Sequence, residues 1–81
     1  MDRVGEAHVR VPLARVGRDA LADLREVLAA HPGSCDTFLH LVNGDDNETI
    51  LALPATLRVA VGDQIVNAVE RLLGAGVMYF R

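Results

Sequence analysis

Hydrophobic and polar residues alternate in three stretches of the chain, roughly residues 7–13, 35–42 and 48–53. This two-residue period is typical of β-strands with one buried face. In the first stretch, Pro12 lacks a backbone N–H and should therefore lie at a strand end or an unpaired edge. The apolar residues 77–80 predict a last short strand. Residues 57–61 alternate once more, and they either extend the strand that ends at Pro54 or form a short strand of their own.

Two other segments carry apolar residues three and four positions apart, which predicts amphipathic helices. The first runs from Asp19 to Ala30 and ends at His31-Pro32-Gly33, because proline disfavours helical geometry in the residue before it. The second begins near residues 62–63, with Asp63 as a candidate cap and Gly62 as a less favourable one, and ends at Gly74. Their apolar stripes are Leu21, Leu24 and Leu28 in the first helix, and Ile65, Val66, Val69, Leu72 and Leu73 in the second.

The central stretch, His31 to Pro54, is interpreted as a hairpin around which the other elements are arranged. Its turn, Asn43-Gly44-Asp45-Asp46-Asn47, contains the Asn-Gly pair typical of tight hairpins. The apolar residues of its two strands should pair across the sheet and carry both helices. They are Phe38, Leu39, Leu41, Ile50, Leu51 and Leu53.

The elements follow the order β-α-β-β-α-β, which predicts an α+β two-layer sandwich of the split β-α-β (ferredoxin-like) type. Both helices should cover one face of a mainly antiparallel sheet. We expect residues 1–6 to form a flexible leader and residues 7–81 to form a single small domain.

Charge and aromatic content argue against direct nucleic-acid binding. The formal net charge is −3, and eight arginines, with no lysine, are scattered along the chain. Nucleic-acid-binding domains normally gather basic residues on one face. The aromatic residues are only Phe38, Tyr79 and Phe80, so we also expect no base-stacking platform.

The single cysteine, Cys35, cannot form a disulfide within the chain, which fits a reducing compartment. The N-terminal residues lack the pattern of a secretory signal, and no stretch approaches the ~20 apolar residues of a membrane span. We therefore expect a cytoplasmic location.

Candidate chemistry is sparse. Cys35, His31 and His40 are the only cluster with metal-ligating side chains, but Cys35 and His40 should face opposite sides of one strand. We expect a buried or half-buried thiol and histidines that touch solvent. Cys35 also follows a helix C-terminus and lacks a base on its own strand face, which disfavours a nucleophile.

The acidic loop and the C-terminal segment also have simple structural readings. Asp45, Asp46 and Glu48 lack the ligand spacing of a calcium loop, so we interpret them as a solvated hairpin tip. Residues 76–81 carry Tyr79 and Phe80 near their end, as clamp-binding peptides carry aromatics, but they lack the usual glutamine and fit a core strand better. The residues thus predict no catalytic site, no cofactor site and no metal site.

Beyond these patterns, the chain resembles a known family over roughly residues 7–80. A helix ends in His-Pro-Gly, a strand of the type Phe-Leu-x-Leu follows, and "Leu-Pro … Arg-Val" precedes a helix that ends in Leu-Leu-Gly. In this form the sequence is similar to the C-terminal domain of the bacterial DNA polymerase III alpha subunit. The corresponding residues are His31, Pro32, Gly33, Phe38, Leu39, Leu41, Leu53, Pro54, Arg58, Val59, Leu72, Leu73 and Gly74. Asp36 and Thr37 stand where that pattern usually has Pro-Val.

The resemblance implies a non-catalytic interaction domain. The parent of such a domain is a DNA-directed DNA polymerase, and its C-terminal region contacts the tau subunit of the clamp loader and neighbouring polymerase domains. One alternative is a small-ligand regulatory domain of the ACT type, which has the same order of elements. A small enzyme is disfavoured because the residues form no catalytic constellation.

Overall fold

The computed structural model describes residues 5–17, 19–44 and 47–81. The elements in chain order are β1 (Glu6–Pro12), α1 (Leu13–Val16), α2 (Asp19–Ala29), β2 (Pro32–Val42), β3 (Glu48–Ala52), the 3₁₀ turn η1 (Ala55–Leu57), α3 (Asp63–Leu73) and β4 (Met78–Phe80). The α+β class and the predicted order of strands and main helices are confirmed. The structure adds α1, a short helix between β1 and α2 that the hydrophobic pattern did not predict.

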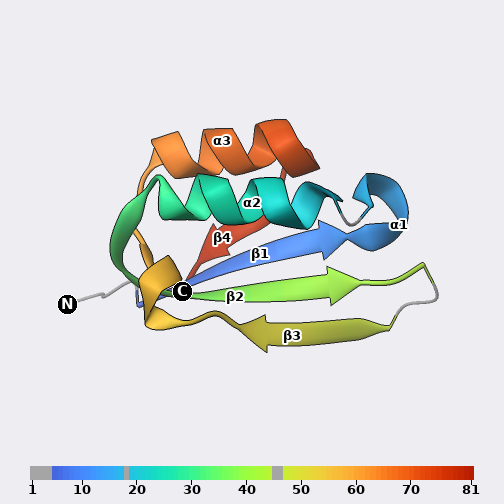
Figure 1. The fold of residues 1–81 in the computed structure, drawn as a ribbon, viewed down its shortest axis with the longest axis horizontal. Coiled ribbons are helices and arrows are strands. Elements are labelled where there is room, and N and C mark those ends of the chain that lie inside the picture. Colours follow the sequence, from blue (N-terminus) through green and yellow to red (C-terminus); the bar gives the residue numbers. More distant parts are fainter. Residues whose placement is uncertain (1–4, 18, 45–46) are drawn as a thin grey trace.

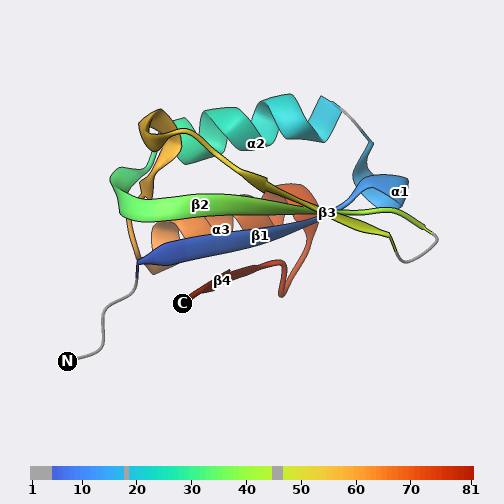
Figure 2. The same ribbon diagram turned by 90° about the horizontal axis from the view of Figure 1, so that it is seen from below.

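The four strands form one sheet in the order β3-β2-β1-β4. β1 pairs with β2 in parallel, whereas β1–β4 and β2–β3 are antiparallel. Helices α2 and α3 lie side by side over one face of this sheet (Figures 1 and 2). The predicted sheet, mainly antiparallel with both helices on one face, is therefore confirmed.

One detail of the predicted topology differs, because β1 and β2 are direct neighbours. In a split β-α-β arrangement another strand lies between the two parallel strands. Here the short hairpin places β3 outside β2 instead, and all five β3 residues are exposed. The central place goes to β1, whose Ala7, Val9 and Val11 are completely buried.

The core lies between the sheet and the two helices. Odd-numbered residues of β1 and β2 face the helices, and the predicted helix stripes supply the other wall, with α2 burying Leu24 and Leu28 and α3 burying Ile65, Val69 and Leu73. Burying an aliphatic side chain of this size contributes roughly 1.5–3 kcal/mol. The buried apolar residues are Ala7, Val9, Val11, Ala20, Leu24, Leu28, Cys35, Leu39, Val59, Ile65, Val69, Leu73, Val77 and Met78.

The hairpin carries the helices less fully than predicted. Leu39 pairs with Leu51 across β2 and β3, but Leu51 is 43% exposed and Ile50 is 57% exposed. Phe38 and Ile50 lie on the face away from the helices, because they alternate with the helix-facing residues. The prediction that all six hairpin residues carry both helices is therefore wrong for Phe38, Ile50 and Leu51. β3 lies at the edge of the sheet, outside β2 and away from the two helices (Figure 1).

Residues 58–60 form a strap that lies against the start of β2. Val59 makes isolated bridges to Pro32 and Cys35. The amide of Gly33 donates to the Arg58 carbonyl over 3.1 Å, and the amide of Ala60 donates to the His31 carbonyl over 3.0 Å. Residues 58–60 therefore neither extend β3 nor form a strand of their own, so both alternatives predicted for residues 57–61 are wrong.

Backbone hydrogen bonds join the first described residues to the C-terminal residue. β1 begins at Glu6, which the sequence assigned to the leader, and the Gly5 amide donates to the Arg81 carbonyl over 2.9 Å. The division into a leader and one domain stays a prediction, because residues 1–4 lie outside the described part. α3 begins at Asp63 with Gly62, rather than Asp63, at its cap position. Among the described residues, no helix is long and apolar enough to cross a membrane.

Candidate functional site

The face of the sheet away from the helices carries a chain of four polar side chains. Glu6 and His8 come from β1, His40 from β2 and Glu48 from β3. Even-numbered residues of β1 and β2 point to this face, because side chains alternate along a strand. The parallel register places His8 beside Phe38 and Arg10 beside His40.

Three short contacts join these four side chains in a line. Nε2 of His8 lies 2.9 Å from Oε1 of Glu6, and Nδ1 of His40 lies 3.0 Å from Oε1 of Glu48. Between them, Nδ1 of His8 and Nε2 of His40 are 2.8 Å apart. We call this set the Glu6–His8–His40–Glu48 chain. Both histidines are buried, at 7% and 9% exposure, whereas the two glutamates are about half exposed.

The burial of His40 corrects a prediction made for His31 and His40. The sequence suggested histidines that touch solvent, and only His31 remains partly exposed. Sequence reasoning missed the Glu6–His8–His40–Glu48 chain because its members lie on three strands, with His8 and His40 32 positions apart in the sequence. The available signal was the alternation itself, which places Glu6 and His8 on one face of β1.

Aromatic rings hold His8 in place from both sides. The His8 ring stacks on Phe38 of β2 with centroids 5.0 Å apart and on Tyr79 of β4 with centroids 4.9 Å apart. Stacked rings of this kind contribute about 0.5–1.5 kcal/mol each. Both faces of the His8 ring are therefore used inside the protein, so this stack does not offer His8 to a nucleic-acid base.

The sequence-predicted cluster of Cys35, His31 and His40 is not brought together. Cys35 lies in the core under the helices, whereas His40 lies on the opposite face of β2, as the alternation predicted. His31 lies at the end of α2, where its Nδ1 donates to the Val27 carbonyl over 2.9 Å. Among the described residues, no group of three or more His, Cys, Asp or Glu side chains is placed to hold a metal ion.

The Cys35 thiol lies in surroundings that favour its protonated form. Burial, and secondly the neighbouring carboxylate of Asp36, raises the pKa of this thiol. A reactive cysteine needs the opposite shift, because the thiolate is the nucleophile.

The acidic hairpin tip is only partly covered by the structure. Asp45 and Asp46 lie outside the described residues. The turn closes through the Asn43 amide, which donates to the Asn47 carbonyl over 2.9 Å. Glu48 is not simply a residue of the solvated tip, since it contacts His40. The C-terminal aromatic segment forms β4 and pairs with β1, which confirms the predicted strand.

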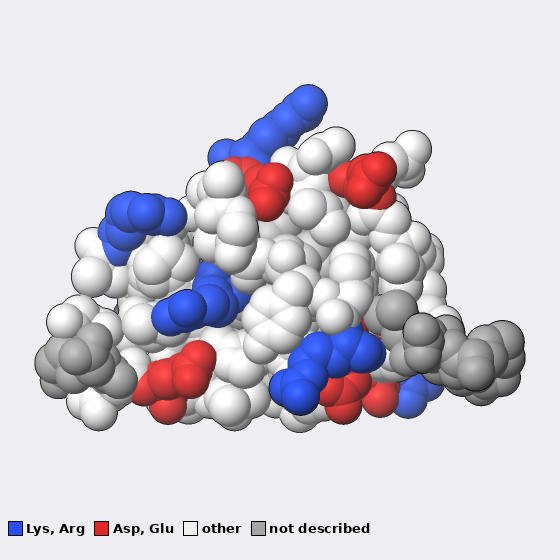
Figure 3. Space-filling model, turned by 180° about the vertical axis from the view of Figure 1, so that it is seen from behind, with Lys and Arg blue, Asp and Glu red and all other residues white. Residues whose placement is uncertain are grey.

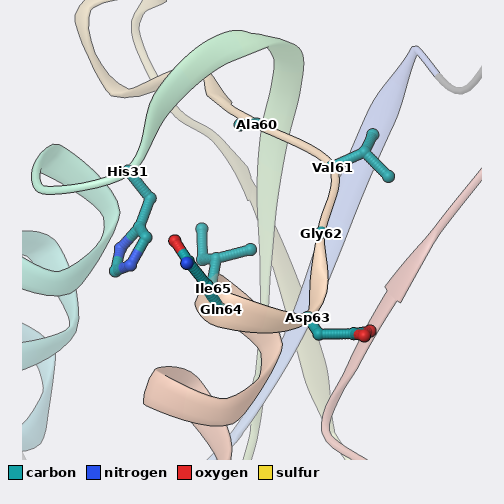
Figure 4. Close-up of a pocket in the computed structure, with 7 residues that line it drawn as sticks. All are labelled: His31, Ala60, Val61, Gly62, Asp63, Gln64 and Ile65. Atoms are coloured by element: carbon teal, nitrogen blue, oxygen red, sulfur yellow. The ribbon is translucent and has the colours of Figure 1, made fainter.

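A shallow hollow of about 200 Å³ lies where the strap meets α3. His31 and Gln64 lie on one side of it, and the Asp63 side chain points away from His31 (Figure 4). It is lined by His31, Ala60, Val61, Gly62, Asp63, Gln64 and Ile65. Because the Asp63 side chain points away from His31, these two polar side chains do not converge on one point in the hollow.

Charged side chains are mixed on the molecular face seen in Figure 3. Arginines and acidic residues are interspersed there, with no continuous block of either sign. Such a distribution lacks the basic stripe that backbone phosphates attract.

No protein-family model matches the chain, and no solved structure matches it. DNA polymerase III subunit alpha of Mycobacterium tuberculosis is 36% identical over 70 residues, which are 86% of this chain and 6% of that protein. The same subunit of Mycobacterium leprae is 37% identical over 60 residues, which are 74% of this chain and 5% of that protein. The chain is related to a part of DNA polymerase III subunit alpha. It spans about one twentieth of the length of these relatives.

Two parts of the pattern that resembles DNA polymerase III subunit alpha, the His-Pro-Gly turn and the Arg-Val pair, meet in the fold. His31 and Gly33 form backbone hydrogen bonds with the strap that contains Arg58 and Val59. The two departures from the family pattern contact the same region. Nε of Arg58 donates to Oδ1 of Asp36 over 2.7 Å, and the Thr37 hydroxyl donates to the Leu57 carbonyl over 2.9 Å. The polymerase relatives do not favour the ACT-type alternative.

Proposed function

We propose that this chain is a non-catalytic interaction domain, equivalent to the C-terminal domain of DNA polymerase III subunit alpha. In this proposal it acts in the cytoplasm and links the replicative polymerase to the tau subunit of the clamp loader. The observation that carries the proposal is the 36% identity over 70 residues to the polymerase subunit of M. tuberculosis. The activity of the whole polymerase belongs to other parts of such a protein.

The contacts between the strap and β2 support the assignment to this domain. The His-Pro-Gly turn and the Arg-Val pair lie 25 to 28 residues apart in the sequence, yet they share backbone hydrogen bonds. A pattern whose separate parts constrain one another is more informative than the same residues scattered over a surface. The family's catalytic carboxylates lie far upstream of its C-terminal domain, which fits a purely binding role for this chain.

The edge strand β3 is the surface that best fits an interaction role. All five of its residues are exposed, and in the described part of the chain its outer edge pairs with no other strand. Exposed edges accept an extended segment of a partner through backbone hydrogen bonds, while side chains beside the edge supply specificity. Ile50, 57% exposed at the middle of β3, would contact such a segment.

The test is a titration of the 81-residue chain with a C-terminal fragment of tau, followed by calorimetry and by amide NMR shifts. We expect saturable heat and shift changes centred on β3. Ile50→Asp should weaken binding at least tenfold. Val61→Asp serves as the matched control, because Val61 is similarly exposed (54%) but lies beside α3.

Three outcomes separate the parts of the proposal. Absence of heat and of NMR shifts at high micromolar concentrations would refute tau binding. Binding that V61D abolishes and I50D leaves intact would refute β3 as the surface. A thermal shift with free amino acids, in the absence of tau binding, would favour a ligand-binding domain instead.

A further inference from the structure

The three contacts in the Glu6–His8–His40–Glu48 chain require three protons. Each contact is short enough for a hydrogen bond, at 2.9, 2.8 and 3.0 Å, and each hydrogen bond needs one proton between its two heavy atoms. Two neutral imidazoles provide only two protons, one each. Ionised carboxylates provide none. We propose that His8 and His40 bind one additional proton and share it between Nδ1 of His8 and Nε2 of His40.

The outer contacts fix where that proton lies. Nε2–H of His8 donates to Glu6, and Nδ1–H of His40 donates to Glu48, because a carboxylate can only accept. Without the additional proton, two nitrogen lone pairs would then face each other at 2.8 Å. With one more proton still, two N–H groups would collide at the same place. All three hydrogen bonds therefore form only when the two imidazoles together carry three N–H protons.

The surroundings stabilise a single positive charge on the pair. The acidic groups on this sheet face are Glu6 from β1, Asp36 from β2, which is paired with Arg58, and Glu48 from β3. The cations beside them are Arg10 on β1 and Arg81 after β4, whose backbone pairs with that of Glu6. β4 contributes the Tyr79 ring, which stacks on His8, and α2 and α3 lie on the other face. Cation–π contact with Phe38 and Tyr79 further favours a protonated His8.

A shared proton makes folding depend on pH in a defined direction. Above the ordinary histidine range, near pH 6.5, unfolded histidines have lost their extra protons while the folded pair keeps one. The folded state then binds more protons, so its stability falls as the pH rises. Well below pH 6.5 the unfolded chain holds two extra protons against one in the folded pair, so stability also falls toward acid.

Replacing one carboxylate with an amide tests the proton count directly. In Glu48→Gln the amide itself can donate to Nδ1 of His40, so two neutral imidazoles complete all three hydrogen bonds. Between pH 7 and 8 the unfolding constant of the unmodified chain should rise by up to tenfold per pH unit. The E48Q variant should lose this rise. Glu6→Gln, at the other end of the Glu6–His8–His40–Glu48 chain, should lose this pH dependence too.

The matched control is Glu26→Gln on the exposed side of α2, which should keep the full dependence. Urea unfolding at several pH values gives the constants. A pH-independent unmodified chain would overturn the proposal, and so would an E48Q variant with the slope of E26Q. If E48Q does not fold, E6Q decides the question by the same comparison.

NMR of the ¹⁵N-labelled chain gives a second readout that a merely structural contact would not produce. A shared proton predicts a scalar coupling across the hydrogen bond between Nδ1 of His8 and Nε2 of His40. His31 is the internal reference, because its ring hydrogen-bonds to the Val27 carbonyl at the end of α2, apart from the other two histidines. Two histidines with separate titrations and no mutual coupling would overturn the proposal. These results do not depend on whether the chain binds tau.

Discussion

The contact between Gly33 and the strap makes Gly33→Ala the most informative single substitution. A Cβ atom on Gly33 would overlap the backbone N and Cα of Ala60 and lie 2.5 Å from the Val59 carbonyl carbon. These are backbone atoms, which cannot rotate away as a side chain can. The strap must therefore move away from β2.

The expected cost follows from what the strap loses. Two backbone hydrogen bonds join it to residues 31–33, each contributing about 0.5–1.5 kcal/mol. The side chain of Val59, in the middle of the strap, is completely buried, and full exposure of a valine side chain would cost roughly 1.5–3 kcal/mol. Partial displacement should therefore cost about 2–4 kcal/mol. For a domain of this size, that lowers the Tm by roughly 10–25 °C.

Urea and thermal unfolding, followed by circular dichroism, measure this effect. Gly5→Ala is the matched control, because a Cβ atom at Gly5 meets nothing within 4 Å. Amide hydrogen exchange at Gly33 and Ala60 should accelerate in G33A and stay unchanged in G5A. A G33A variant as stable as G5A, with protected amides at both positions, would refute the reasoning.

Two further predictions concern other contacts. Arg15→Gln removes the guanidinium whose Nη2 donates to the Leu73 carbonyl at the end of α3, and should lower the free energy of unfolding in urea by about 0.5–1.5 kcal/mol. The control Arg25→Gln, at an exposed position of α2, should cost almost nothing. Equal effects of the two substitutions would contradict the capping role of Arg15. Because burial raises the pKa of the Cys35 thiol, the folded state keeps a proton that the unfolded chain loses near pH 8.5, so stability should fall above that pH. Cys35→Ala should remove this alkaline loss, and a C35A variant that keeps the whole of it would show that another group is responsible.

Periodicity along the chain was sufficient to predict the main elements. The stripes of α2 and α3 and the alternation in β1 and β2 depend on local geometry, which repeats every 3.6 or 2 residues. His31-Pro32-Gly33 ended the first helix as predicted, because the proline acts on the residue directly before it. The placement of Cys35 in the core and His40 on the other face also followed from alternation.

Only tertiary structure decided which residues meet across the sheet. The Glu6–His8–His40–Glu48 chain depends on the parallel register of β1 and β2, and a slip of one residue would turn either histidine toward the helices. The position of β3 outside β2 exposed Ile50 and Leu51, which their apolar character alone assigned to the core. The requirement for glycine at position 33 comes from the backbone of residues 59–60. Sequence patterns specify faces and periods, whereas contacts between distant strands depend on the register and strand order that the whole core selects.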